Sequence, residues 1–261
     1  LEQITVTAAR AKRPIEDVPQ TVQVIDRTEI EKQLEMSPSP AAALARLVPG
    51  YSPSTQTVSG ASETFRGRDL LVMMDGVPLN TPLRDVSRIL NLLDLSSVER
   101  IEVVAGASSL YGAGATGGTV NFITRKAADG GPKVGVNMAM RAFTANVGTS
   151  LAPELSGSIS GSTPAAFDYT IIGSGRGAGR TYDGAGRELP SDAVRGQGGG
   201  DRFVNGNLLA KLGYNFDAAK RIELRNRIVV AVRAYPRERH QALDRIGRKA
   251  EAFARQGGAH R

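Results

Sequence analysis

The chain has 261 residues with no cysteine, no tryptophan and two histidines, and its formal net charge is +7 at pH 7. The lack of cysteine excludes thiol nucleophiles, disulfides and Cys/His zinc sites. The positive excess lies entirely in residues 221–261, which hold 11 Lys and Arg against 4 Asp and Glu, whereas residues 1–220 hold 22 of each. A neutral body offers no clustered basic face, so no nucleic-acid partner is predicted.

Residues 1–17 form the first predicted segment, a short extended run followed by a linker. The run is Ile4, Thr5, Val6, Thr7 and Ala8, which alternates as a strand does. The linker, residues 9–17, is polar and charged. A terminal segment of this composition is expected to be mobile.

Residues 18–126 combine helical and strand patterns. Strands are predicted at residues 21–25, 70–74, 101–104 and 119–124, and helices at residues 27–34 and 40–47. Asp26 is the predicted N-cap of the first helix, and Pro49-Gly50 ends the second. This mixed order predicts an α+β domain with a small mixed sheet.

A glycine cluster precedes the last of these strands. Gly112, Gly114 and Gly117 satisfy the G-x-G-x-x-G spacing of a dinucleotide-binding loop. Such a loop must open a helix, because the helix N-terminus holds the pyrophosphate. Residues 119–123 are instead β-branched and aromatic, which favours a strand. The cluster is therefore interpreted as a turn between strands.

After Lys126 the pattern changes to long alternating strands. Residues Val134, Val136, Met138 and Met140 share one face, and residues 167–171 and 204–214 alternate in the same way. Apolar-out, polar-in strands of about ten residues are what a membrane barrel with a wet lumen requires. An ordinary antiparallel sheet with one solvated face has the same period, so the pattern alone leaves both open.

The connections and the C-terminal stretch complete the organisation. Residues 175–201 are glycine-rich and charged, which predicts a long loop, and residues 215–220 predict a short turn. The strand region is therefore assigned to residues 127–228. After Ile228 an arginine-rich stretch has apolar residues at helical spacing, which predicts a basic helical tail over residues 229–261.

Three motifs in order resemble those of TonB-dependent outer-membrane receptors. Val98–Thr124, with its strand, small-residue turn, glycine cluster and second strand, resembles the closing signature of the family's plug domain. Phe65-Arg66-Gly67, followed by an apolar strand into Asp75-Gly76-Val77, is similar to the family's Arg-Gly step and Asp-Gly-Val strand. Ile4 to Ala8 resembles the TonB box.

The resemblance implies a fold class. Residues 18–126 would be an α+β plug domain with a small mixed sheet, and residues 127–228 would be antiparallel strands of an incomplete membrane β-barrel. It favours the barrel over the ordinary sheet, with residues 175–201 as an extracellular loop and residues 215–220 as a periplasmic turn. It also implies that the protein is located in the cell outer membrane, with the plug facing the periplasm and outer-membrane lipid around the strands.

The resemblance also implies roles for individual residues. The TonB box would add as an edge strand to a periplasmic TonB-type energy transducer. Ligand-binding apices are expected at Ser54, Thr55, Gln56, Arg68, Asp69, Leu83 and Arg84. Arginines there suit an anionic ferric complex, because guanidinium offers fixed charge and forked donors. Arg66 and Glu102 are expected to belong to the lock that holds the plug in the barrel lumen.

The sequence departs from the family in two places. A plugged barrel needs about 22 strands, on the order of 220 residues, whereas 135 residues follow Lys126. The chain is therefore not expected to close a barrel, and the abrupt change after Ile228 favours a truncated or frame-shifted reading, or a fragment, of a longer receptor gene. Ala105 stands where the family usually has an arginine, so the lock would rest on Arg66.

The implied function is energy-coupled uptake of a ferric siderophore, with cobalamin or haem as alternative ligands. The rival hypothesis is a non-transporting, plug-like periplasmic module, or a truncated gene product, that only binds the transducer. No catalytic residue, metal site or cofactor is predicted. Both histidines lie in the basic tail, and Ser108 and Ser109 have no base nearby in sequence to activate them.

Overall fold

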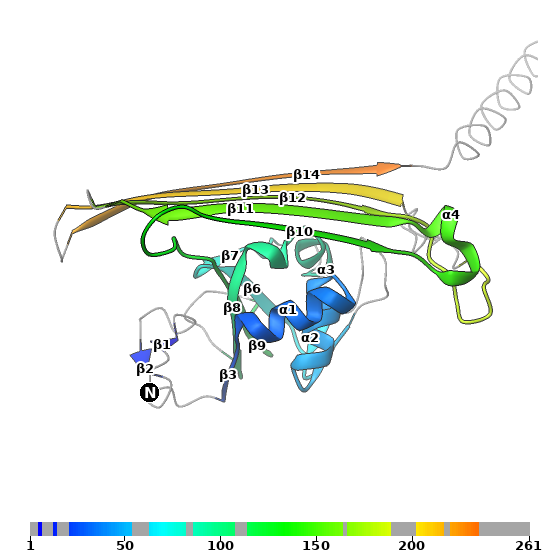
Figure 1. The fold of residues 1–261 in the computed structure, drawn as a ribbon. Helices are drawn as coiled ribbons and strands as arrows, with labels where there is room; N and C mark the ends of the chain where they lie inside the picture. Colours follow the sequence, from blue (N-terminus) through cyan, green and yellow to red (C-terminus); the bar gives the residue numbers. More distant parts are fainter. Residues whose placement is uncertain are drawn as a thin grey trace, which may run out of the picture.

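The computed structural model describes residues 5–6, 13–14, 21–53, 63–81, 86–107, 114–163, 166–188, 202–216 and 220–234. Residues 21–124 build an α+β unit, and the strands between residues 133 and 234 build a long antiparallel sheet across one side of it. The strands of the unit run steeply away from the long sheet (Figure 1). One end of the small sheet therefore meets the long sheet and the other points away from it.

The α+β unit is built on a five-stranded mixed sheet in the order β3-β8-β9-β6-β7. Its strands are β3 (Val22–Ile25), β8 (Val98–Ala105), β9 (Gly118–Thr124), β6 (Leu70–Met74) and β7 (Val77–Pro78). β6 and β9 pair in parallel, and the other neighbours pair antiparallel. The remaining elements are α1 (Arg27–Met36), α2 (Pro40–Leu47), α3 (Val86–Asn91), the 3-10 turn η2 (Leu95–Ser97), and the paired strands β4 (Tyr51–Ser52) and β5 (Thr64–Phe65).

Local sequence signals explain where the first two helices begin. The Asp26 carboxylate accepts a hydrogen bond from the Glu29 N–H at 2.9 Å, so Asp26 caps α1 as predicted. Ser39 caps α2, and Pro40 takes the first helical position, where its missing N–H leaves no bond unmade. α2 has the predicted bounds, whereas α1 ends at Met36 instead of Leu34.

The core of the unit lies between the small sheet and the helices. All five residues of β6 are buried, as are Ile30, Leu44 and Phe122. A continuous apolar run of this kind fits a strand that is covered on both faces. Burial of each large apolar side chain contributes about 1.5–3 kcal/mol. The α+β unit therefore has a core of its own.

Close backbone approach explains the glycine cluster. A Cβ on Gly117 would lie 2.4 Å from the carbonyl oxygen of Phe65, and a Cβ on Gly118 would lie 2.4 Å from that of Val104. Neither position has room for a side chain. β9 begins directly at Gly118, so the turn opens a strand and not the helix that a dinucleotide-binding loop requires.

The long sheet is an antiparallel meander in chain order. Its strands are β10 (Lys133–Arg141), β11 (Ala152–Ser162), β12 (Phe167–Ala178), β13 (Arg202–Asn215) and β14 (Arg221–Ala234). The 3-10 turn η3 (Thr144–Asn146) and α4 (Val147–Ser150) connect β10 to β11. Within the described ranges, β10 and β14 each pair on one side only, so the sheet is open. This confirms the predicted incomplete barrel.

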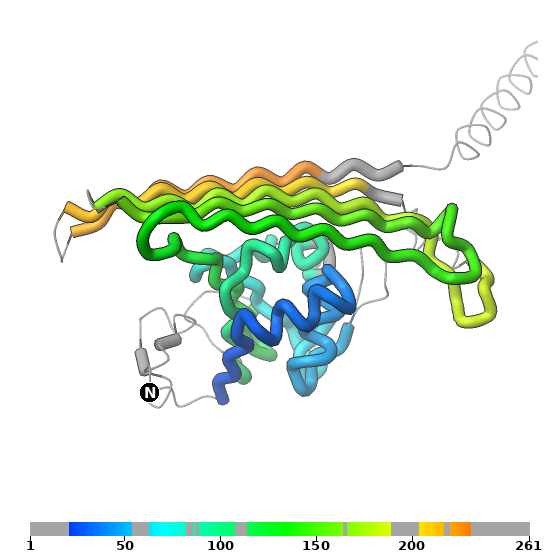
Figure 2. Tube along the Cα trace, viewed as in Figure 1, coloured from blue at the N-terminus to red at the C-terminus, as the bar shows by residue number. Residues whose placement is uncertain are grey.

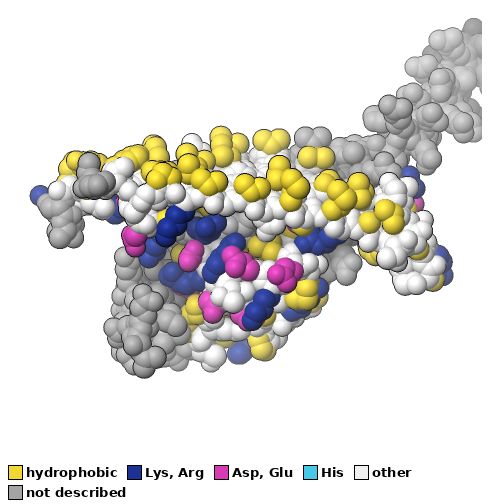
Figure 3. Space-filling model, in the orientation of Figure 1, with side chains coloured by type: hydrophobic (Ala, Val, Ile, Leu, Met, Phe, Trp, Pro, Cys, Tyr) yellow, Lys and Arg dark blue, Asp and Glu magenta, His cyan; other side chains and the backbone are white. Residues whose placement is uncertain are grey.

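The two faces of the long sheet differ in polarity. The row Val134, Val136, Met138 and Met140 on the outer face of β10 is 68–77% exposed. Apolar side chains cover the outer side of the sheet (Figure 3). On the inner face, Thr170, Asn205 and Lys211 are all buried. The predicted alternation is confirmed. No helix in the described parts of the chain combines the length and hydropathy of a membrane span.

Two strand boundaries and one strand pairing differ from the prediction. β14 continues past Ile228 to Ala234, because the β-branched residues there remain paired with β13. β12 reaches Ala178 and so enters the predicted loop. β1 (Thr5–Val6) pairs with β2 (Arg13–Pro14), within a segment that the sequence predicts to be mobile. The predicted helical tail beyond β14 lies outside the described residues.

The glycine turn yields a first testable prediction. Gly117→Ala should destabilise the α+β unit by about 1–3 kcal/mol, because the new Cβ meets backbone that cannot move aside. Gly131→Ala is the matched control, since nothing lies within 4 Å of its Cβ position. Urea unfolding followed by circular dichroism measures both. Equal stability of the two variants would contradict the close-approach explanation.

Candidate functional site

The inner face of the long sheet meets the α+β unit mainly through polar side chains. Figure 2 shows the unit held against this one face of the five strands. Most of these contacts form two groups. We name the first the carbonyl seam, formed by Arg176, Asn205 and Arg227 with the carbonyl oxygens that they bind. The second, the Asp75 node, comprises Asp75, Thr124, Lys211 and Arg225.

The carbonyl seam joins three strands to the end of α3. Arg176 on β12 donates to the Asn91 oxygen at 2.6 Å and to the Pro38 oxygen at 3.0 Å. Asn205 on β13 donates to the Asn91 oxygen at 3.3 Å, and Arg227 on β14 donates to the Leu92 oxygen at 2.6 Å. The last carbonyls of a helix have no partner inside it. Side-chain donors from the strands therefore supply hydrogen-bond partners for the carbonyl oxygens at the C-terminus of α3.

Asp94 adds a side-chain contact beside the seam. Its carboxylate caps η2 by accepting from the Ser96 N–H at 2.9 Å. It also accepts from the hydroxyl of Ser174 on β12, at 2.6 Å. The carboxylate thus fixes the 3-10 turn and the strand at the same time.

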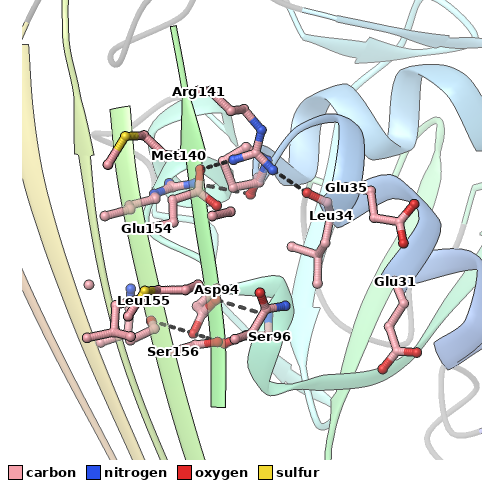
Figure 4. Close-up of a pocket in the computed structure, with 18 of the residues that line it drawn as sticks. Glu31, Leu34, Glu35, Asp94, Ser96, Met140, Arg141, Glu154, Leu155 and Ser156 are labelled. Atoms are coloured by element: carbon pink, nitrogen blue, oxygen red, sulfur yellow. Dashed lines mark hydrogen bonds and ion pairs between the residues drawn. The ribbon is translucent and has the colours of Figure 1, made fainter. Parts of the chain in front are cut away.

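A cavity of about 520 Å3 lies between α1 and strands β10 to β12. Arg141 bonds to Glu154 on the neighbouring strand and to the carbonyl oxygen of Leu34 in α1. Glu31 and Glu35 of α1 line the side across from this pair (Figure 4). The lining charges are mixed in sign, so the cavity has no clear preference for an anion or a cation.

The Asp75 node lies at the end of β6 that faces the long sheet. The Asp75 Oδ2 atom is 2.7 Å from Arg225 Nη1 on β14 and 3.9 Å from Lys211 Nζ on β13. Lys211 also donates to the Thr124 oxygen at 3.3 Å. Glu223 pairs with Arg225 at 2.8 Å and so supports the arginine from its other side.

The connections at one end of the long sheet pack on each other. The hydroxyls of Thr149 and Tyr182 are 2.5 Å apart, and the ring of Tyr182 meets that of Phe143 edge-on at 5.9 Å. Beside them, the N–H groups of Arg187 and Ala185 donate to Asp183 and hold the pKa of that carboxyl below its usual value. The part of the predicted long loop that the structure describes is therefore ordered by specific contacts.

The predicted site residues fall into two sets. Ile4, Thr7, Ala8, Ser54, Thr55, Gln56, Leu83 and Arg84 lie outside the described residues. Arg68 and Asp69 are exposed beside a tight turn at Arg66 and Gly67, whose φ angles of 54° and 70° are those of a type I′ hairpin turn. This turn precedes Leu70, at the end of β6 away from the long sheet.

The predicted lock residues occupy different environments. Arg66 is exposed, and its guanidinium lies 5.6 Å from the centre of the Phe65 ring. Glu102 is fully buried in β8 and pairs with Arg100 at 2.8 Å. Glu102 is therefore part of the interior of the α+β unit. The role of Arg66 as a lock stays a prediction, because its turn points away from the five strands.

Sequence reasoning did not identify the residues of the two contact groups. The sequence did contain a pattern that points to these residues. Inward positions of the alternating strands hold four cations: Arg176, Lys211, Arg225 and Arg227. A cation on the inner side of such a strand requires an acceptor inside the barrel. The partners themselves follow only from the fold.

Comparison with known proteins gives the same assignment for the first half of the chain. Residues 14–119 match the family model described as TonB-dependent Receptor Plug Domain. A ferric aerobactin receptor from Klebsiella pneumoniae is 41% identical over 125 residues, which is 48% of this chain and 17% of that protein. A vitamin B12 transporter BtuB from Photobacterium profundum is 36% identical over 130 residues, which is 46% of this chain and 20% of that protein.

Two further comparisons extend into the long sheet. A rhizobactin receptor from Rhizobium meliloti (strain 1021) is 27% identical over 230 residues, covering 85% of this chain and 30% of that protein. The crystal structure of a mutant ferric enterobactin receptor, PfeA from Pseudomonas aeruginosa, superposes with a TM-score of 0.64 at 19% identity, covering 89% of this chain and 35% of that one. This chain thus spans about a third or less of these proteins. The chain is therefore similar to the first part of TonB-dependent receptors: residues 14–119 match their plug domain, and five strands of an open antiparallel sheet follow.

Proposed function

We propose that this chain is part of an outer-membrane receptor that imports a ferric siderophore with energy from a periplasmic TonB-type transducer. One observation carries the proposal: the long sheet is apolar outside and polar inside, and the plug occupies the polar side. Lipid suits the outer face, and a polar lumen suits the inner one. A soluble periplasmic module would gain nothing from exposing Val134, Val136 and Met138 at 72–77%, so the receptor is favoured over the non-transporting module.

The ligand class is proposed from the names of two relatives and from one predicted ligand-binding residue, Arg68. Two relatives are, by name, receptors for ferric aerobactin and for rhizobactin. Arg68 is exposed at a predicted apex, where its guanidinium can bind carboxylate or catecholate oxygens of an anionic iron complex. Vitamin B12, in the name of another relative, is the alternative cargo.

The transducer contact is proposed at residues 4–8. Among the described residues of this segment, the backbone of Thr5-Val6 pairs with Arg13-Pro14, and so short a pairing is easily exchanged for the edge of a partner sheet. β3 is the first strand of the plug sheet after this segment, and it is a four-residue edge strand. A pull on the N-terminus would therefore reach the plug at a short, weakly paired edge.

Ligand titration tests the proposed cargo. The full chain in detergent micelles should bind ferric aerobactin in preference to cyanocobalamin. Arg68→Ala should weaken that binding about tenfold, because a charge-assisted hydrogen bond is lost. Lys133→Ala removes an exposed cation at the start of β10 and should leave binding unchanged. Preference for cyanocobalamin would replace the siderophore proposal with cobalamin uptake, and equal effects of the two variants would remove Arg68 from the site.

Peptide titration tests the transducer contact. A peptide of residues 1–12 should bind the periplasmic domain of the transducer. Val6→Pro should abolish binding, because proline removes an amide donor and fixes φ, whereas Val6→Ala should weaken it only modestly. Equal losses would indicate side-chain readout in place of strand addition. If the unaltered peptide does not bind, the TonB-box assignment is wrong.

A further inference from the structure

We infer that Asp75 is the residue that ties the plug to the barrel wall, as a plug carboxylate held between two cations of the strands, Lys211 and Arg225. The lock expected at Arg66 would use a plug cation in place of a plug carboxylate. The Asp75 tie also lies at the other end of β6 from Arg66. The inference concerns how the plug is held and does not depend on which ligand is imported.

The turn that carries Asp75 is fixed within the plug. The Asp75 carboxylate accepts from the Thr124 N–H at 2.9 Å and from the Thr124 hydroxyl at 2.6 Å. The Gly76 N–H donates to the Asn121 side chain at 2.9 Å. Asp75 itself has a φ of 49°, a left-handed conformation that few residue types other than glycine adopt, although aspartate tolerates it. Both residues of the turn are thus bound to β9, and the carboxylate is presented to the strands in one direction.

The strands supply matching cations at this position. The Asp75 and Lys211 side chains are 8% and 10% exposed, so water screens their attraction weakly. Arg225 makes the shorter contact, 2.7 Å, and is itself oriented by Glu223. Removing Asp75 leaves the nearly buried Lys211 without its counter-ion, and removing Arg225, which is 37% exposed, takes away the shorter of the two contacts to the buried Asp75. Loss of either Asp75 or Arg225 should therefore weaken docking more than loss of a surface charge.

The Asp75 node differs in kind from the carbonyl seam. Arg176 and Arg227 bind main-chain oxygens, which are present whatever side chain the plug has at those positions. The Asp75 contacts depend on one plug side chain. Like the bond between Asp94 and Ser174, the node therefore depends on the side chain at one plug position, whereas the seam depends on the plug backbone.

Distance measurement between two spin labels tests the tie. Because the chain has no cysteine, Met36→Cys on α1 and Ile171→Cys on the outer face of β12 can be labelled selectively, and both positions are exposed. In the full chain in micelles, the distance distribution separates docked from displaced plug. Asp75→Asn is compared with Asp129→Asn, which removes the same charge at an exposed site. Arg225→Met tests the tie from the strand side and leaves the bonds between Asp75 and Thr124 in place.

Asp75→Asn and Arg225→Met should each raise the ratio of displaced to docked plug by about tenfold or more. The double variant should be no worse than either single one, because both remove the same interaction. Asp129→Asn should leave the ratio unchanged, because Asp129 is exposed and lies outside both contact groups. Additive effects of Asp75→Asn and Arg225→Met, or an Asp75→Asn effect no larger than that of Asp129→Asn, would overturn the inference.

Discussion

Apolar and polar side chains alternate with a period of two along the five long strands, and this alternation decides which face of the sheet the plug can bind. A strand with one face toward lipid must pair its backbone within the sheet and place apolar residues outward. Polar side chains are then confined to the inner positions, where they meet the plug. Each inward cation needs an acceptor there: Arg176 and Arg227 use carbonyl oxygens at the end of α3, and Lys211 and Arg225 use Asp75.

The contacts that stabilise the plug itself are separate from the contacts that hold the plug against the long sheet. The plug has its own apolar core around β6, Ile30 and Phe122, and no described side chain of the long strands belongs to it. The plug and the wall adhere through hydrogen bonds and ion pairs, each worth about 0.5–3 kcal/mol and replaceable by water. The plug can therefore leave the wall without losing its core. This division of contacts is compatible with the proposed transport through a plugged barrel.

Local signals in the sequence predicted much of the fold and little of the interface. β6, α2 and the Asp26 cap follow from neighbouring residues and are confirmed. α3 is six residues long, too short to show a helical period, and β11 is rich in serine and glycine; neither was predicted. The docking contacts join positions as far apart as Pro38 and Arg176, which no local pattern can pair. The burial of Glu102 and its pairing with Arg100 likewise follow from the fold and not from a local pattern.

We expect the outer face of the long sheet to lie against lipid, as its inner face lies against the plug. Two neighbouring leucines of β13 test it, because Leu208 is 42% exposed on the outer face and Leu209 is 3% exposed on the inner face. Leu208→Cys and Leu209→Cys, each carrying a nitroxide, are compared in lipid–detergent micelles by collision with oxygen, which concentrates in the apolar phase, and with a water-soluble nickel complex. If the outer face lies against lipid and the inner face against the plug, oxygen collisions should be frequent at position 208, and position 209 should be protected from both reagents. Equal collision rates at the two positions, or nickel access at position 208, would contradict it.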